Sequence, residues 1–157
     1  MPPYPIILSY IQAEALLTAK GQGNAVLEVS PDLGITTVTV KLLDEDVEFP
    51  LGERVRWSDI ERMKKTITNC FIVKEGGVQT IQTFSEYTNR VCSLLPTKRT
   101  PSMLIAGFTM HRIVDIDPMQ DTLKKIATIA PIVGSVLDTA TGLGYTAIEA
   151  AKTAEQV

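Results

Sequence analysis

Chemically reactive side chains are scarce in this sequence. It contains one histidine and two cysteines, Cys70 and Cys92, which do not form a C-x-x-C pair. Protein metal sites usually gather several His and Cys ligands, so nothing in the sequence indicates a metal site. Two isolated thiols also cannot supply the disulfide framework of a small secreted domain. We expect both cysteines to be reduced and buried.

Strong net charge and long apolar runs are absent as well. Fifteen basic and eighteen acidic residues give a formal charge of −3, so charge does not indicate a nucleic-acid partner. No apolar stretch reaches the roughly 18 to 20 residues that cross a bilayer, and residues 1–5 lack the basic start of a secretion signal. The sequence predicts a cytoplasmic protein without a membrane segment.

Residues 1–112 have the pattern of an α+β domain with mostly antiparallel strands. Apolar residues at helical spacing predict a helix over 6–20, and alternating residues predict hairpins over 25–42 and 47–57. A capping-box pattern, Ser58 to Glu61, predicts a helix with Ile60, Met63 and Ile67 on its buried face. Further strands are expected at 70–73, 78–84, 91–95 and 103–110, with a turn at Glu75–Gly77.

The aromatic residues of this first domain are expected to form its core. Trp57, Phe71 and Phe84 alternate with polar residues, and no basic residues lie between them as they would in a base-stacking surface. We therefore interpret all three as core anchors.

Residues 113–157 have a different pattern, typical of the start of an α/β unit. Asp117 can cap a helix that begins at Pro118, with an apolar stripe of Met119, Leu123, Ile126 and Ala127. A short strand at 135–137 is then followed by a loop of small residues and by an Ala-rich helix from Tyr145 to about Thr153.

The loop at residues 138–144 is the most informative stretch of the chain. Gly142 and Gly144 allow a close backbone approach, and the start of the following helix favours an anionic group. Gly142 to Ala147 fits the G-x-G-x-x-G/A pattern of dinucleotide-binding loops. Asp138, however, would lie close to a diphosphate, whereas it would attract a ligand with an ammonium and a sulfonium group. The loop therefore favours a cationic cofactor that resembles an amino acid.

The run from Val136 to Gly144 resembles the first motif of class I S-adenosylmethionine-dependent methyltransferases, with Ala140 in place of the usual first glycine. Together with Met110–Arg112 and Asp117–Asp121, it is similar to the predicted archaeal and bacterial methyltransferases that have a β-rich N-terminal domain. The resemblance implies a Rossmann-like domain at 113–157 that binds S-adenosylmethionine. The cofactor-binding residues that it implies are Asp138, Thr139, Ala140, Thr141, Gly142, Leu143, Gly144, Tyr145 and Thr146.

Other residues have weaker functional interpretations. The resemblance implies that Met119, Gln120 and Asp121 lie at the edge of the cofactor site. His111 is either a general base or a hydrogen-bonded structural residue, and the structural reading is favoured. Arg112 either binds an acidic substrate or pairs with Asp115 or Asp117. Neither the catalytic residues nor the methyl acceptor is identified by the sequence.

The resemblance also implies that the chain is truncated just after the first cofactor motif, because the acid expected to bind the ribose hydroxyls lies beyond Val157. We then expect no transferase activity from the 157-residue chain alone, and self-association through an exposed sheet edge near residues 134–157. Two alternatives stay open, namely an NAD(P)-binding oxidoreductase and a non-enzymatic oligomerisation or interaction module.

Overall fold

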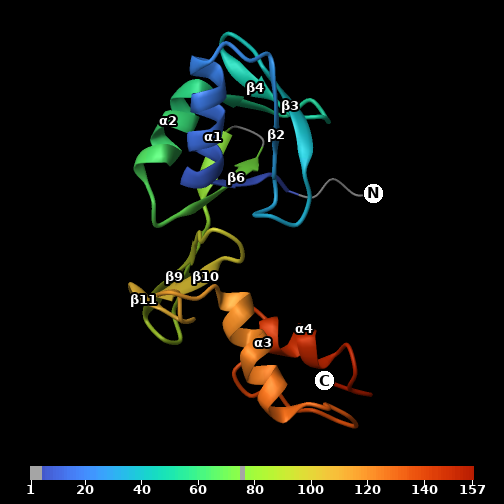
Figure 1. Cartoon of the computed structure of the whole chain (residues 1–157). Coiled ribbons are helices and arrows are strands. Elements are labelled where there is room, and N and C mark those ends of the chain that lie inside the picture. The colour runs from blue at the N-terminus through green and yellow to red at the C-terminus, as the bar shows by residue number, and fades with distance from the viewer. Residues whose placement is uncertain (1–4, 75–76) are drawn as a thin grey trace.

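The computed structural model describes residues 5–74 and 77–157, which form three antiparallel sheets and four helices. In Figure 1 the elements follow one another from an N-terminal lobe with two helices, through a central sheet, to two C-terminal helices. The fold is therefore mixed α+β with mostly antiparallel strands, as predicted for the larger part of the chain. None of the helices in the described residues has the length and apolar character needed to cross a membrane.

The N-terminal lobe contains two of the sheets. One has the strand order β1-β6-β7 and the other has the order β2-β3-β4-β5. The strands are β1 (Ile7–Ser9), β2 (Val26–Val29), β3 (Val38–Leu42), β4 (Asp46–Glu48), β5 (Arg54–Arg56), β6 (Cys70–Lys74) and β7 (Gly77–Thr80). The hairpins predicted over 25–42 and 47–57 are confirmed. The turn expected at Glu75–Gly77 has Glu75 and Gly76 outside the described residues.

Helix α1 (Tyr10–Gly21) begins later than predicted. The expectation of a helix from Ile6 is wrong because residues 7–9 pair with β6 as strand β1. Ser9 then caps the helix: its Oγ accepts from the Ile11 N–H at 3.3 Å, and its own N–H donates to Gln12 Oε1 at 3.0 Å. These reciprocal bonds form a capping box, which satisfies N–H groups that would otherwise have no partner.

Helix α2 (Trp57–Lys65) begins one residue before the predicted cap. Ser58 lies within the helix, and Arg56 occupies the capping position without a side-chain hydrogen bond, so the capping box predicted at Ser58–Glu61 is wrong. Burial of Trp57 and Ile60 in the core outweighs the local capping preference. Ile67, expected on the buried face, lies after the end of the helix and is 61% exposed.

The core of the molecule lies in the N-terminal lobe, where α1 and α2 pack side by side (Figure 1). Trp57 and Phe71 are buried in it, as predicted. Its other buried members are Ile6, Leu8, Ala13, Leu16, Val29, Val40, Val47, Phe49, Val55, Ile60 and Met63. Both cysteines are free thiols. Cys70 is buried, as expected, whereas Cys92 is half-buried.

Replacing Trp57 with phenylalanine is expected to lower the free energy of unfolding by about 2 kcal/mol. The indole Nε1 donates to the Leu43 carbonyl at 2.9 Å, and the smaller phenyl ring would lose this bond and leave part of the site unfilled. Urea unfolding followed by circular dichroism measures the change. Tyr87→Phe is a suitable control because Tyr87 is 99% exposed, and it should change stability by less than about 0.5 kcal/mol. Equal stability of Trp57→Phe and wild type would contradict this account of the core.

The central sheet has the strand order β11-β10-β9-β8. Its strands are β8 (Gln82–Ser85), β9 (Arg90–Leu95), β10 (Ser102–Ile105) and β11 (Phe108–Thr109). The single strand predicted over 103–110 is in fact a hairpin, which turns at Ala106 and Gly107 with φ of 50° and 85°. The strand predicted over 78–84 is divided between two sheets. Phe84 is 55% exposed, so its prediction as a core anchor is wrong.

The C-terminal part contains α3 (Pro118–Ile129) and α4 (Tyr145–Ala150), which pack against each other (Figure 1). Asp117 caps α3, and Pro118 occupies the first turn, as predicted. The expected apolar stripe is only half covered, because Met119 and Ile126 are half-buried whereas Leu123 and Ala127 are exposed. The predicted strand at 135–137 is reduced to one bridge residue, Ser135, and α4 ends at Ala150 instead of near Thr153.

Candidate functional site

The predicted cofactor loop lies between two short segments that run in the same direction. Ser135, before the loop, forms a parallel bridge with Gln156, after α4. The Val136 N–H donates to the Gln156 carbonyl at 2.8 Å, and the Glu155 N–H donates to the Gly134 carbonyl at 2.9 Å. An extended segment, a loop, a helix and a second parallel segment therefore follow one another at residues 134–157. A βαβ unit has the same order of elements, but here the pairing is a single bridge and no strand forms within residues 134–157.

Asp138 holds the two ends of this loop together. Its Oδ1 accepts from the Ala140 N–H at 3.1 Å, and its Oδ2 accepts from Thr146 Oγ1 at 2.7 Å, at the start of α4. The Thr141 hydroxyl donates to the Asp138 carbonyl at 3.3 Å. The carboxylate is half-buried. A carboxylate has about four lone-pair sites, so two remain for a ligand.

Both glycines have conformations that other residues resist. Gly142 has φ of 55° and Gly144 has φ of 80°. A Cβ atom at Gly142 would also overlap the sulfur of Met110, which lies directly against the loop. Ala140 is not among the residues with positive φ, so alanine is tolerated where the methyltransferase motif usually has its first glycine. The backbone conformation therefore favours glycine at positions 142 and 144, but it does not require glycine at position 140.

Tyr145 joins the loop to the central sheet. Its hydroxyl donates to the Pro101 carbonyl at 2.7 Å, and its ring centroid lies 5.2 Å from that of His111. Burial raises the pKa of the Tyr145 hydroxyl to about 12, and the charge of Asp117 acts in the same direction. Tyr145 is therefore a neutral hydrogen-bond donor at physiological pH. It positions the loop and is a poor proton-transfer group.

His111 has the hydrogen bonds of a structural residue. Its Nδ1 lies 3.0 Å from Ser102 Oγ, and its backbone N–H donates to the same oxygen at 3.3 Å. Ser102 is completely buried, so this serine cannot meet a substrate. Burial lowers the pKa of His111, the charge of Lys125 lowers it further, and Asp121 opposes both. These contacts favour the structural interpretation over a general base.

The imidazole of His111 is expected to titrate below its ordinary pKa of 6.5. Because the folded pKa is lowered, the unfolded chain binds more protons in the window just below pH 6.5. The contribution of His111 to stability is therefore complete above pH 6.5 and is lost as the pH falls through the folded pKa. His111 is the single histidine, so its Cε1–H resonance in an NMR titration reports this pKa directly. A measured value above 6.5 would contradict the environment described here.

Among the described residues, Met119, Gln120 and Asp121, predicted at the edge of the cofactor site, do not line a cavity together with the loop. Gln120 lines a cavity of about 520 Å³ together with Asp117, whereas Leu143 lines a separate, mostly apolar cavity of about 220 Å³ on the central sheet. Asp121 is engaged in an ion pair with Lys125 at 2.6 Å. Gln120 and the glycine loop therefore face different cavities in this structure.

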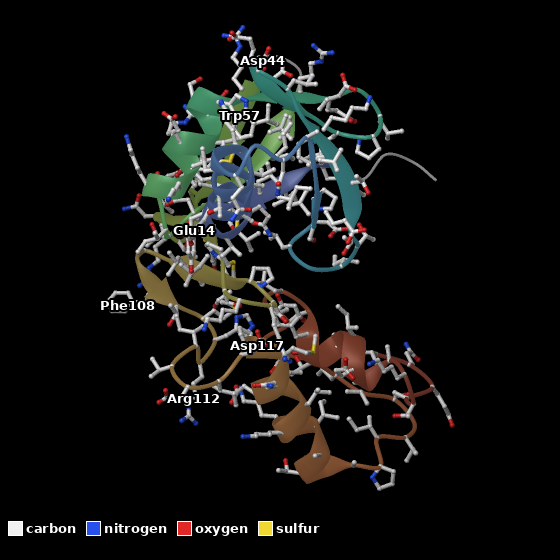
Figure 2. All side chains as sticks on the ribbon, turned by 45° about the horizontal axis from the view of Figure 1, so that its top comes forward. Glu14, Asp44, Trp57, Phe108, Arg112 and Asp117 are labelled. Atoms are coloured by element: carbon white, nitrogen blue, oxygen red, sulfur yellow. The ribbon has the colours of Figure 1, made fainter. Side chains whose placement is uncertain are left out.

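Asp117 is more extensively bonded than its predicted capping role requires. Besides the Met119 N–H at 2.9 Å, its carboxylate accepts from the N–H and the hydroxyl of Thr100 at 3.1 and 3.3 Å, and from Thr97 Oγ1 at 3.4 Å. Figure 2 places it at the junction between the central sheet and α3. The bonds to Thr97 and Thr100 join residues 17 to 20 positions apart, so no local sequence pattern predicts them. Asp117 therefore ties the C-terminal helices to the loop between β9 and β10.

Arg112 does not form the ion pair considered from the sequence. It is exposed, and within residues 5–74 and 77–157 it pairs with neither Asp115 nor Asp117. In Figure 2 its side chain lies at the outside of the segment that leads into α3. Arg112 therefore remains available to solvent or to a ligand.

Comparison with known proteins gives one informative relative. No protein family matches the chain as a whole or in part. The uncharacterized protein MJ1233 of Methanocaldococcus jannaschii is 30% identical over an alignment of 157 residues, which covers 97% of this chain and 53% of the relative. The chain thus spans about half the length of the curated relative that it matches, and the similarity extends over both the β-rich part and the glycine loop.

Proposed function

We propose that residues 134–157 form the start of an S-adenosylmethionine-binding unit and that the protein is a methyltransferase of the Rossmann-like class. The observation that carries this proposal is the parallel bridge between Ser135 and Gln156, which encloses the Asp138–Gly144 loop and α4. Parallel strands joined by a helix, with the ligand at the carboxyl end of the first strand, are the general plan of nucleotide-binding α/β folds.

The charge of Asp138 favours S-adenosylmethionine over a dinucleotide. A carboxylate at the end of the first strand attracts the ammonium and sulfonium charges of this cofactor and repels a diphosphate. Its two free lone-pair sites are consistent with a ligand that donates hydrogen bonds. Thr139 and Thr141 are exposed beside it and offer further hydroxyl groups. NAD(P) is the alternative ligand, because Gly142 to Ala147 also fits the dinucleotide pattern.

Little acid–base catalysis is needed for the proposed reaction. The sulfonium is an activated methyl donor, so alignment of the donor with the acceptor supplies much of the acceleration, up to about 7 to 11 kcal/mol in well-aligned systems. The structural role of His111 is therefore compatible with methyl transfer. The residues proposed here bind and orient the cofactor through Asp138 and the loop backbone.

Titration calorimetry with the 157-residue chain tests the proposal. S-adenosylhomocysteine, the demethylated product, is expected to bind saturably, and NAD is expected to bind at least about tenfold more weakly. Preferential binding of NAD would favour the oxidoreductase alternative. Absence of binding by either ligand at millimolar concentration would contradict the cofactor assignment.

We also propose that the C-terminal part self-associates with a second copy of the chain. Its apolar side chains include several that are largely exposed, namely Ile129, Val133, Leu137 and Ile148, with exposed fractions of 65, 71, 85 and 55%. In the described part of the chain, the two segments of the parallel bridge pair with no further strand, so each has an edge that a second copy can pair with. Light scattering is expected to give a mass that rises with concentration, and Leu137→Ser should reduce the association. A monomer at all concentrations would contradict this proposal.

A further inference from the structure

Two adjoining cavities surround the loop between β9 and β10. Both are lined by Pro96, Thr97, Lys98 and Arg99. The smaller cavity, of about 170 Å³, extends from this loop to the start of α1, and the larger one, of about 520 Å³, extends to the start of α3. The two cavities share these four lining residues, and we refer to them together as the groove. The groove is distinct from the glycine loop, which lines neither cavity.

The charged lining residues of the smaller cavity are both positive and both exposed. Lys98 and Arg99 are its charged lining residues, and no carboxylate lines it. In the described part of the chain, neither side chain forms an ion pair or a hydrogen bond. Two adjacent cations without acidic partners in a concave site favour a ligand with a doubly charged oxyanion.

A neutral donor lies in the same cavity. Gln12 uses its Oε1 to accept from Ser9, and among the described residues its amide NH₂ donates no hydrogen bond. This amide could therefore donate to an oxyanion beside Lys98 and Arg99. The first turn of α1 is already capped by Ser9, so the helix end is not the basis of the site.

The acidic residues of the groove lie in the larger cavity. Asp117 accepts four hydrogen bonds from its own surroundings, and Asp115 is the remaining carboxylate. Lys98 and Arg99 line both cavities, but only the larger one also has carboxylates, so an oxyanion is favoured in the smaller cavity, of about 170 Å³. A ligand with hydroxyl groups could extend into the larger cavity, where Asp115 and Gln120 are hydrogen-bonding partners.

We propose that this groove binds a phosphate monoester, with the phosphate held by Lys98, Arg99 and the Gln12 amide, and with the polyhydroxylated part of the ligand directed toward Asp115 and Gln120. The site does not depend on S-adenosylmethionine binding at Asp138. Its lining residues come from both residues 1–112 and residues 113–157, so both parts of the chain contribute to the binding site.

Titration calorimetry with ribose 5-phosphate and with ribose tests this site. Ribose 5-phosphate is expected to bind and ribose is not, because the phosphate supplies the interaction with the two cations. The double variant Lys98→Ala/Arg99→Ala should weaken ribose 5-phosphate binding at least about tenfold, since it removes two charge-assisted contacts. Gln12→Glu, which places a carboxylate beside the phosphate, should weaken it as well.

The matched control is Lys64→Ala/Lys65→Ala, which removes an adjacent pair of exposed cations outside the groove. It should leave ribose 5-phosphate binding unchanged. Circular dichroism confirms that both double variants are folded. The proposal would be overturned by equal binding to the wild type and the Lys98/Arg99 variant, by an equal loss in the Lys64/Lys65 control, or by no binding to the wild type at millimolar concentration.

Discussion

Replacing Asp138 with asparagine is expected to weaken binding of S-adenosylhomocysteine at least about tenfold. A hydrogen bond to a charged group contributes about 1.5 to 3 kcal/mol, and a factor of ten in affinity corresponds to about 1.4 kcal/mol. Asparagine is nearly the same size, and its amide oxygen can still accept from the Ala140 N–H, as Oδ1 does at 3.1 Å. The variant therefore removes the charge and largely keeps the loop. Calorimetric titration of both proteins measures the ratio of dissociation constants.

A charge change outside the loop at residues 138–144 provides the control for this experiment. Glu155→Gln removes one carboxylate from an exposed position after α4. It should change the affinity by less than about threefold, because exposed charges are screened. If Asp138→Asn bound the ligand as well as the wild type did, Asp138 would be a residue that only orders the loop. Its bonds with the Ala140 N–H at 3.1 Å and Thr146 Oγ1 at 2.7 Å would then be its whole role.

Leu16→Ala is expected to lower the free energy of unfolding by about 3 kcal/mol, the largest stability effect predicted for this chain. Leu16 is completely buried and belongs to the cluster that joins α1 and α2 to the two N-terminal sheets. Its truncation removes apolar contacts and leaves a cavity among residues that cannot all move inward. Urea denaturation followed by circular dichroism gives the difference.

Leu51→Ala is the matched control, because it makes the same truncation at a position that is 72% exposed. Its effect should stay below about 0.5 kcal/mol. A loss under about 1 kcal/mol for Leu16→Ala would show that α1 is not packed as described. Chemical-shift changes confined to the N-terminal lobe in the Leu16→Ala variant would further show that the packing of this core does not affect the glycine loop.

Local patterns in the sequence predicted several elements correctly. Val38, Val40 and Leu42 alternate with polar residues, and they form the strand β3 in the expected hairpin. Asp117 and Pro118 marked the start of α3, because capping and the fixed φ of proline depend only on neighbouring residues. The same reasoning failed where a partner from elsewhere decides the conformation. Residues 7–9 form a strand because β6 lies beside them.

Sheet membership was the other feature that the sequence did not specify. The apolar pattern over 78–84 is continuous, yet β7 pairs with β6 and β8 pairs with β9. Phe84 belongs to β8 in the second of these sheets and is exposed there, which no local pattern reports. Long-range pairing decides between alternatives that have equal strand propensity.

The sequence predicted only those residues of the candidate site that lie close together along the chain. Asp138, Gly142 and Gly144 lie within seven residues, so their spacing is visible in the sequence. The contact of Met110 with Gly142 and the hydrogen bond from Tyr145 to Pro101, 44 residues earlier, arise from the fold. Identification of S-adenosylmethionine as the ligand remains a prediction based on resemblance and charge.

The most direct test of the account is an NMR titration of the ¹⁵N-labelled chain with S-adenosylhomocysteine. If the loop binds this ligand, the amide resonances of Gly142, Gly144 and Ala140 will shift saturably, and those of the phosphate groove at Lys98 and Arg99 will not. An unchanged loop at millimolar ligand, or shifts confined to residues outside 134–157, would contradict the proposal that this loop is a cofactor site.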